Sequence, residues 1–187
     1  IEKYPQISLD LNLNNRRVDL ITEGFDVALR VGKLNDSSLI SKHLGGSHAQ
    51  LFAAPQYLDT QSGIDKLEDL ENHQLLYMSD SDTGNHWTLQ NQAGQQKQIA
   101  VYPKIRINDL TTLQAVAENG GGIAWIPSYL AHDALENERL TCVLPEWTSP
   151  HFNFYAIFPS RQGATQKVRA WIDFISEKMK TNANIRL

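Results

Sequence analysis

The fold class is decided by residues 107–130, which read INDLTTLQAVAENGGGIAWIPSYL. Asn108 or Asp109 can cap a helix whose apolar side chains recur at helical spacing. The glycines at 120–122 predict its end, and the apolar run 123–126 predicts a short buried strand. The order of helix, glycine turn and strand indicates an α/β protein. The side chains predicted to face inward from the helix are Leu110, Leu113, Val116 and Ala117.

The N-terminal part of the chain predicts a parallel βαβ unit. Residues 7–13 alternate between apolar and polar side chains, the pattern of a strand with one buried face. Asn14 and Asn15 can cap a helix over 16–23, and the apolar run 25–31 suits a strand covered on both faces. A strand, a helix and a second strand in succession imply a parallel sheet.

Similar patterns predict the remaining elements. Helices are expected after Pro55, around 64–70, over 128–134 and from residue 165, where an apolar stripe begins. A hairpin with a glycine-containing loop is expected within 87–101. Further strands are expected at 49–54, 75–78, 105–107, 140–144 and 152–158.

Composition narrows the function classes. The chain has 187 residues, which is enough for one large domain or two small lobes, and 41% of them are hydrophobic. A net charge of −4 argues against this chain itself holding a nucleic-acid backbone, which needs a basic patch. The single cysteine, Cys142, excludes an internal disulfide and favours a reducing compartment. No run approaches the roughly 18–20 apolar residues that span a bilayer.

No catalytic, metal or cofactor motif is recognisable. The six histidines are scattered, without the paired spacing of a zinc site, so no metal is expected. The glycines at 120–122 follow a helix and precede a strand, the reverse of the order in a dinucleotide site, so no cofactor is expected. Because no nucleophile, base and orienting group assemble, we do not expect an enzyme.

Five phrases, in order along almost the whole chain, carry a family likeness. They lie at 4–32, 34–45, 51–58, 107–130 and 166–175 and read YPQISLDLNLNNRRVDLITEGFDVALRVG, LNDSSLISKHLG, LFAAPQYL, INDLTTLQAVAENGGGIAWIPSYL and QKVRAWIDFI. Together they resemble the effector-binding (substrate-binding) domain of LysR-type bacterial transcription regulators.

The resemblance implies an α/β, two-lobed fold like that of type 2 periplasmic binding proteins, with two crossovers and a ligand cleft between the lobes. Lobe I would comprise 1–48 and 153–187, and lobe II 49–152. It also implies that a first strand and helix of lobe I, about 30 residues, precede residue 1. A winged helix-turn-helix and a linker helix would precede those.

Such a cleft lies at strand carboxyl ends and helix N-termini, where free N–H groups suit an anion. Alternatives stay open: the asparagines can be plain caps, Arg30 can pair with Asp10, Glu23 or Asp26, and the 125–127 side chains can be core. A structural pair is the favoured interpretation of Arg30. The candidate effector-binding residues are Asn14, Arg30, Ser79, Asn108, Leu110, Thr111, Trp125, Ile126 and Pro127.

The resulting hypothesis is a cytoplasmic ligand sensor. It would bind a small effector, an anion or aromatic acid, reach DNA only through a missing N-terminal domain, form a homodimer or homotetramer, and not contact membrane. The first alternative is a free-standing periplasmic-type solute-binding protein of the same fold. The second is an enzyme of similar architecture.

Overall fold

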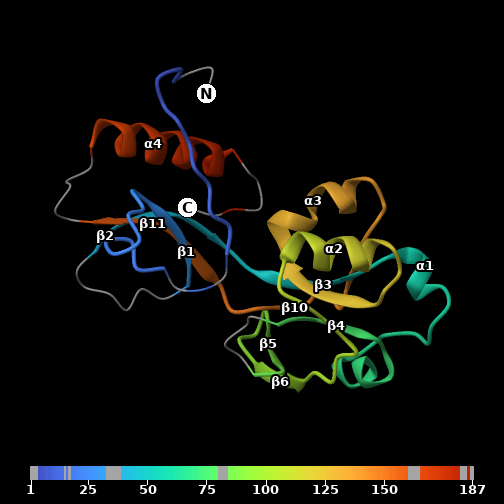
Figure 1. The fold of residues 1–187 in the computed structure, drawn as a ribbon. Helices are drawn as coiled ribbons and strands as arrows, with labels where there is room; N and C mark the ends of the chain where they lie inside the picture. The colour runs from blue at the N-terminus through green and yellow to red at the C-terminus, as the bar shows by residue number, and fades with distance from the viewer. Residues whose placement is uncertain are drawn as a thin grey trace. The chain divides into compact units, whose positions relative to one another are not determined.

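The structure is a computed structural model that describes residues 4–14, 16, 18–32, 39–79, 84–159, 165–181 and 185. The chain divides into two compact units (Figure 1). Unit 1 comprises Ile1–Gly46 and Asn153–Leu187, and unit 2 comprises Ser47–Phe152. The chain therefore passes between the units twice, as expected for a fold with two crossovers. Each unit is described by itself below.

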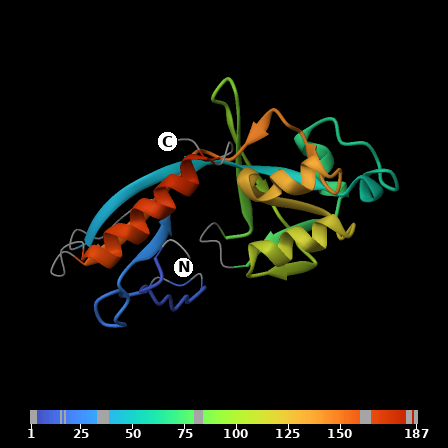
Figure 2. The same ribbon diagram turned by 90° about the horizontal axis from the view of Figure 1, so that it is seen from above.

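Unit 1 is built on a three-stranded sheet with the order β1-β11-β2, namely Ala28–Val31, Phe152–Pro159 and Leu39–Ser47. β1 runs antiparallel to β11, with Ala28 opposite Ile157. Helix α4 (Gln166–Lys180) lies along one face of this sheet, as both views show (Figures 1 and 2). The predicted C-terminal helix is confirmed, and Val168 and Ile172 of its apolar stripe are buried.

The N-terminal βαβ prediction is wrong in three respects. Residues 7–13 are irregular and form no ladder with any described strand. Residues 20–24 form hydrogen-bonded turns in place of a helix, and Asp19, not Asn14, accepts the N–H groups of Ile21 and Thr22. β1 is antiparallel to its neighbour and leaves Leu29 exposed, so it is not covered on both faces. A period-two pattern stabilises a strand only where a neighbouring strand pairs with it.

Unit 2 contains a mixed five-stranded sheet with the order β7-β4-β8-β3-β9. β4 runs parallel to both β7 and β8, whereas β3 runs antiparallel to β8 and β9. Every strand of this sheet lies within or beside a predicted apolar run, so these predictions are confirmed. The strands, from β3 to β9 in chain order, are Ala49–Ala53, Leu75–Met78, Ile105–Ile107, Ile123–Pro127 and Thr141–Val143.

The two faces of this sheet carry separate apolar layers. Helices α2 (Leu110–Glu118) and α3 (Ser128–Glu136) cover one face, around Phe52, Leu113 and Ile126. The other face is covered by short elements and by the three-stranded sheet β10-β5-β6, which contains the predicted hairpin. These elements are α1 (Pro55–Leu58), the 3-10 helix η1 (Leu67–Asn72), β5 (His86–Asn91), β6 (Gln96–Ala100) and β10 (Trp147–Thr148).

Candidate functional site

Three strands of the unit 2 sheet end at one edge. Met78 of β4 lies opposite Ile107 of β7, and the Ser79 N–H donates to the Ile107 carbonyl oxygen at 2.9 Å. Since β8 is also parallel to β4, its last residue, Pro127, ends at the same edge. The candidates Ser79, Asn108 and Pro127 thus follow or end adjacent parallel strands. We call this the carboxyl edge of unit 2.

Helix α2 begins at the carboxyl edge of unit 2. Asp109 is its N-cap, and its carboxylate accepts the Thr112 N–H at 2.6 Å. Hydrogen bonds from Thr112 lower the pKa of the Asp109 carboxyl, which therefore stays ionised. Of the two caps left open by the sequence, the structure selects Asp109. Thr111 is exposed in the first turn, where N–H groups have no partner within the helix and the dipole favours an anion.

We predict that Asp109→Ala destabilises the protein by about 1 kcal/mol, because the first turn of α2 loses its cap. The free energy of unfolding of Asp109→Asn should lie within a few tenths of a kcal/mol of the parent value, since an amide oxygen also accepts the Thr112 N–H. Urea unfolding of each variant gives the free energies. Asp59→Ala, at an exposed carboxylate of the same unit, is the matched control. An equal loss in the control would contradict the capping role.

The candidates on β8 and α2 divide between surface and core. Ile126 is 0% exposed and packs in the layer beneath α2 and α3. Trp125 points to the opposite face because side chains alternate along a strand, and its ring stacks on Trp87 with centroids 5.8 Å apart. Leu110 is half-buried against the α2 layer. The core interpretation therefore describes Ile126, while Trp125 and Leu110 each keep a partly exposed surface.

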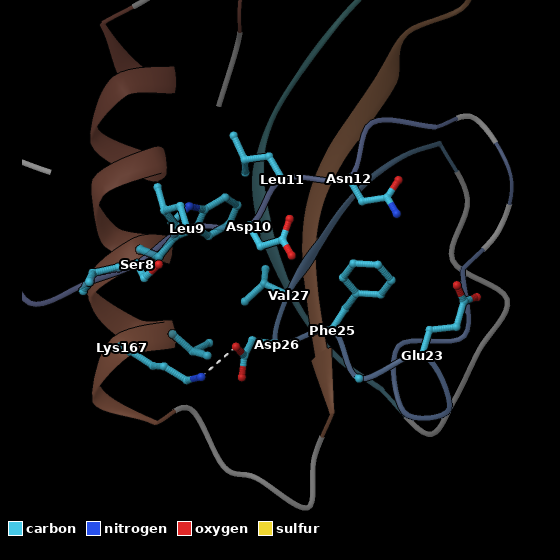
Figure 3. A pocket seen from close by; sticks show the side chains of 14 residues that line it. Ser8, Leu9, Asp10, Leu11, Asn12, Glu23, Phe25, Asp26, Val27 and Lys167 are labelled. Atoms are coloured by element: carbon cyan, nitrogen blue, oxygen red, sulfur yellow. Dashed lines mark hydrogen bonds and ion pairs between the residues drawn. The ribbon is translucent and has the colours of Figure 1, made fainter.

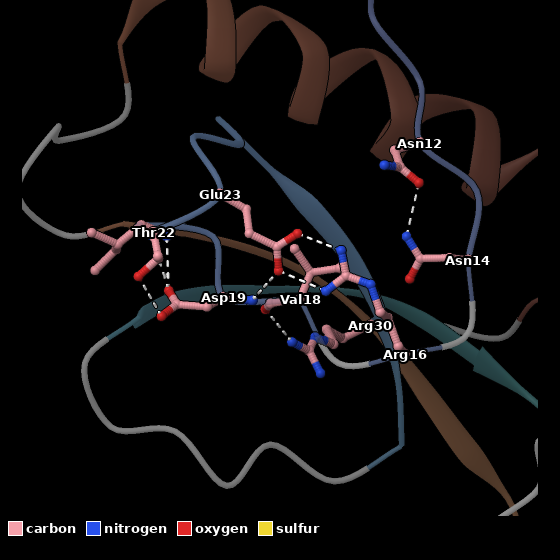
Figure 4. A network of polar contacts seen from close by, with 9 residues as sticks. Asn12, Asn14, Arg16, Val18, Asp19, Thr22, Glu23 and Arg30 are labelled. Atoms are coloured by element: carbon pink, nitrogen blue, oxygen red, sulfur yellow. Dashed lines mark hydrogen bonds and ion pairs between the residues drawn. The ribbon is translucent and has the colours of Figure 1, made fainter.

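The remaining two candidates lie in unit 1 (Figure 4). The Asn14 amide is exposed and donates to the Asn12 side chain at 2.8 Å, while Asn15 lies outside the described residues. The half-buried Arg30 guanidinium donates to the Val18 carbonyl oxygen at 2.9 Å. No contact among the described residues of unit 1 brings either side chain to another candidate.

The favoured carboxylate pair for Arg30 is wrong as far as the described contacts show. Glu23 instead binds Arg16, and the Asp26 carboxylate accepts from Lys167 at 2.7 Å. A guanidinium can donate to a backbone carbonyl oxygen in place of a carboxylate, and sequence patterns do not show which acceptor is near. Among the described residues, Arg30 thus has a structural contact with a backbone carbonyl oxygen.

One residue at the carboxyl edge of unit 2 was not singled out by the sequence. Ser128, the first residue of α3, follows β8, and its buried hydroxyl lies 3.2 Å from that of Ser47. The Ser128 N–H donates to the His48 carbonyl oxygen at 3.0 Å. Serine is a residue type that is favoured at helix starts, although here Pro127 takes the N-cap position and Ser128 is the first helical residue.

The described part of the chain gives no support for a metal site, a reactive thiol or a membrane-spanning helix. Among those residues, no three His, Cys, Asp or Glu side chains lie close enough to hold a metal ion. Burial, and secondarily Glu146, raises the pKa of the Cys142 thiol to about 11, so the reactive thiolate is scarce at neutral pH. None of the described helices is both long and apolar enough to cross a bilayer.

Comparisons with known proteins agree with this architecture. The family model described as "LysR substrate binding domain" matches residues 1–180. The chain is 32% identical over 178 residues to the HTH-type transcriptional activator AaeR of Escherichia coli, covering 95% of this chain but 57% of AaeR. The chain thus spans a little over half the length of that relative.

Two solved structures have the same fold. The regulatory domain of CrgA, a LysR-type transcriptional regulator from Neisseria meningitidis, superposes with a TM-score of 0.85 at 28% identity, over 95% of this chain and 86% of that one. Full-length AphB, a Vibrio cholerae virulence activator, superposes with a TM-score of 0.81 at 30% identity, over 95% and 60%. The chain belongs to the LysR substrate-binding-domain family and is an effector-binding domain of the LysR type.

Proposed function

We propose that this domain is the sensor of a cytoplasmic LysR-type transcription regulator. The support is the family match over residues 1–180 and the regulator names of the relatives. DNA would be bound through a part of the protein beyond this chain, consistent with the chain's net charge of −4. The solute-binding and enzyme alternatives gain no support, because the named relatives are regulators.

The assembly proposed is a homodimer or homotetramer, since regulators of this family form oligomers. The two units would correspond to lobe I and lobe II, with the boundaries Ile1–Gly46 plus Asn153–Leu187, and Ser47–Phe152. Analytical ultracentrifugation of the full-length protein tests the assembly. A monomer at micromolar concentration would contradict it.

The proposed effector is a small anion, with aromatic acids as the second class to test. The observation that carries this proposal is the Ser79 N–H to Ile107 carbonyl bond, which holds the ends of β4 and β7 together where α2 begins. Ser79, Asn108 and Thr111 then surround the α2 N-terminus, where backbone N–H groups and the helix dipole favour negative charge. Aromatic acids also suit the partly exposed Trp125 ring.

We expect a thermal-shift screen of the full-length protein against small carboxylates and aromatic acids to find a stabilising ligand. At 100 times its dissociation constant such a ligand stabilises the native state by about 2.7 kcal/mol. Thr111→Val removes one hydroxyl at nearly constant volume, so its affinity should fall roughly tenfold, the worth of one hydrogen bond to a charged group.

Thr141→Val is the matched control, because Thr141 is exposed on β9 of the same unit. Its variant should bind the ligand as the parent does. A ligand that binds Thr111→Val and Ser79→Ala with unchanged affinity would show that the effector site lies elsewhere. Failure of every compound to shift the melting temperature would contradict the proposed effector class.

A further inference from the structure

Arg106 places a positive charge next to the carboxyl edge of unit 2. It is exposed on β7 and directly precedes Ile107, whose carbonyl oxygen accepts the Ser79 N–H at the end of β4. No ion pair joins the Arg106 guanidinium to a carboxylate of the described residues. In unit 1, by contrast, Lys167 pairs with the Asp26 carboxylate at 2.7 Å (Figure 3). Within the described part of the chain, the charge of Arg106 is therefore not offset by an ion pair.

Two contacts hold the Arg106 guanidinium in one place. Its Nη1 donates to the Asn85 Oδ1 at 2.9 Å, and its Cζ lies 5.4 Å from the centroid of the Tyr77 ring. Tyr77 is opposite Arg106 in the pairing of β4 with β7 and is 2% exposed, so its ring is a fixed support. A guanidinium that stacks on a ring still donates from its edge. Because this guanidinium is already ordered, an anion that binds it does not have to restrict the arginine side chain.

Asn85 joins the ring and the cation to the rest of the sheet. Its N–H donates to the Tyr77 hydroxyl oxygen at 2.9 Å, and its carbonyl oxygen accepts the Val101 N–H at 2.8 Å. Its φ of +53° lies in the left-handed region, which asparagine adopts more readily than most residues with a side chain. With its side chain on Arg106, Asn85 thus contacts β4, β7 and the residue that follows β6.

An aromatic side chain lies in the same row of the sheet. β4 is parallel to β8 with Leu76 opposite Ala124, so the next pair in this register is Tyr77 and Trp125. Both rings pack on the face that carries the β10-β5-β6 sheet, and Trp125 stays partly exposed. Neighbouring strands lie about 4.8 Å apart, so the backbones of Arg106 and Trp125 are roughly 10 Å apart. A cation and an aromatic face are therefore close together beside the carboxyl edge of unit 2.

We infer that Arg106 selects the charged group of the effector: its guanidinium binds the carboxylate of an aromatic acid whose ring lies against Trp125. This inference rests on the effector site proposed above and adds the positive charge that the other candidates at that edge lack. The Asp109 carboxylate at the α2 N-cap repels an anion, and Arg106 offsets this repulsion. The planar guanidinium also matches the two oxygens of a carboxylate.

Benzoate and benzamide test this role, because they share a ring and differ in charge. In the full-length protein, benzoate should bind at least roughly tenfold more tightly than benzamide, as measured by calorimetry. Arg106→Gln should weaken benzoate binding roughly tenfold and leave benzamide binding within about twofold, so the preference for the acid disappears. Arg106→Lys should restore only part of the preference, since an ammonium lacks the planar pair of donors.

Lys104→Gln is the matched control, because Lys104 is an exposed cation close to Arg106 in the chain. This variant removes the same charge and should keep the preference for benzoate within about twofold, since distant exposed charges are screened. The unliganded melting temperature of Arg106→Gln should lie within about 2 °C of that of the parent, which shows that the variant is folded.

The outcomes separate this inference from the proposed effector site. If Arg106→Gln keeps the preference while Thr111→Val binds benzoate more weakly, the effector site stands and the role of Arg106 is overturned. An equal loss of preference in Lys104→Gln would assign it to the overall charge of unit 2 and would also overturn the inference. So would a parent protein that binds benzoate no more tightly than benzamide. If the parent binds neither compound, the proposed class of aromatic acids fails as well.

Discussion

Replacing Gly122 by alanine should destabilise unit 2 by roughly 3 kcal/mol or more, the combined cost of a strained backbone and an overpacked contact. Gly122 has a φ of +137°, a conformation that side-chain-bearing residues rarely adopt. A Cβ atom there would lie 2.3 Å from the Gln74 carbonyl oxygen. That oxygen accepts the Ile123 N–H at 2.8 Å, where the pairing of β4 with β8 begins. The backbone would have to move at the centre of the sheet.

Urea unfolding of Gly122→Ala and Gly63→Ala measures this effect. Gly63 is the matched control, because a Cβ there meets no atom within 4 Å and its φ is not in the left-handed region. Gly63→Ala should therefore change the free energy of unfolding by less than about 1 kcal/mol. Equal free energies for the two variants would contradict the close approach at Gly122. Gly122→Ala should also bind the effector more weakly than the parent if β4 and β8 position the carboxyl edge of unit 2.

Unit 2 was predictable because its signals are local. Each strand of the five-stranded sheet is a short apolar run beside turn residues, and α2 has a stripe, a cap and a glycine stop. The sequence left both Asn108 and Asp109 open as the N-cap of α2, because the choice depends on the residue at which the helix begins. Asp109 is the cap in the structure.

Unit 1 was less predictable because its N-terminal pattern depends on a partner. The alternation of 7–13 specifies which face a strand would bury, but it does not supply the neighbouring strand. The expected helix 16–23 also failed. The Asp19 carboxylate accepts hydrogen bonds from two backbone N–H groups and from the Thr22 hydroxyl. These bonds stabilise a turn over residues 20–24 in place of a helix. Short helices are marginal without tertiary packing, so such a local competitor decides the outcome.

The residues of the candidate site were likewise only partly predictable from the sequence. Ser79, Asn108 and Thr111 could be grouped from the sequence, because the carboxyl ends of parallel strands meet at one edge of a sheet. The contact of Arg30 with the Val18 carbonyl could not, since a backbone acceptor leaves no mark in the sequence. For Trp125 and Ile126, the sequence indicates only that they face opposite sides of β8, not which of the two side chains is fully buried.

Ile126→Ala should destabilise the protein by about 2–5 kcal/mol, the usual cost of removing a buried isoleucine side chain beyond Cβ. Ile126 is 0% exposed and packs with Phe52 and Leu113 between the sheet and the helices. Because β8, α2 and α3 hold this layer, the cavity cannot close without moving them. Urea unfolding of the parent and the variant gives the difference in free energy.

Ile126→Val separates packing from ligand contact. If Ile126 is core, Val should cost about 0.5–1.5 kcal/mol, between the parent and Ala, because the loss follows the volume removed. An effector identified in the thermal-shift screen should bind Ile126→Val as it binds the parent, since a buried methyl group cannot touch it. If Ile126→Val instead unfolds like the parent but binds the effector at least tenfold more weakly, Ile126 lines the site. The packing around Leu113 would then have to open when the effector binds, so that α2, whose N-terminus borders the proposed site, would itself be the moving element.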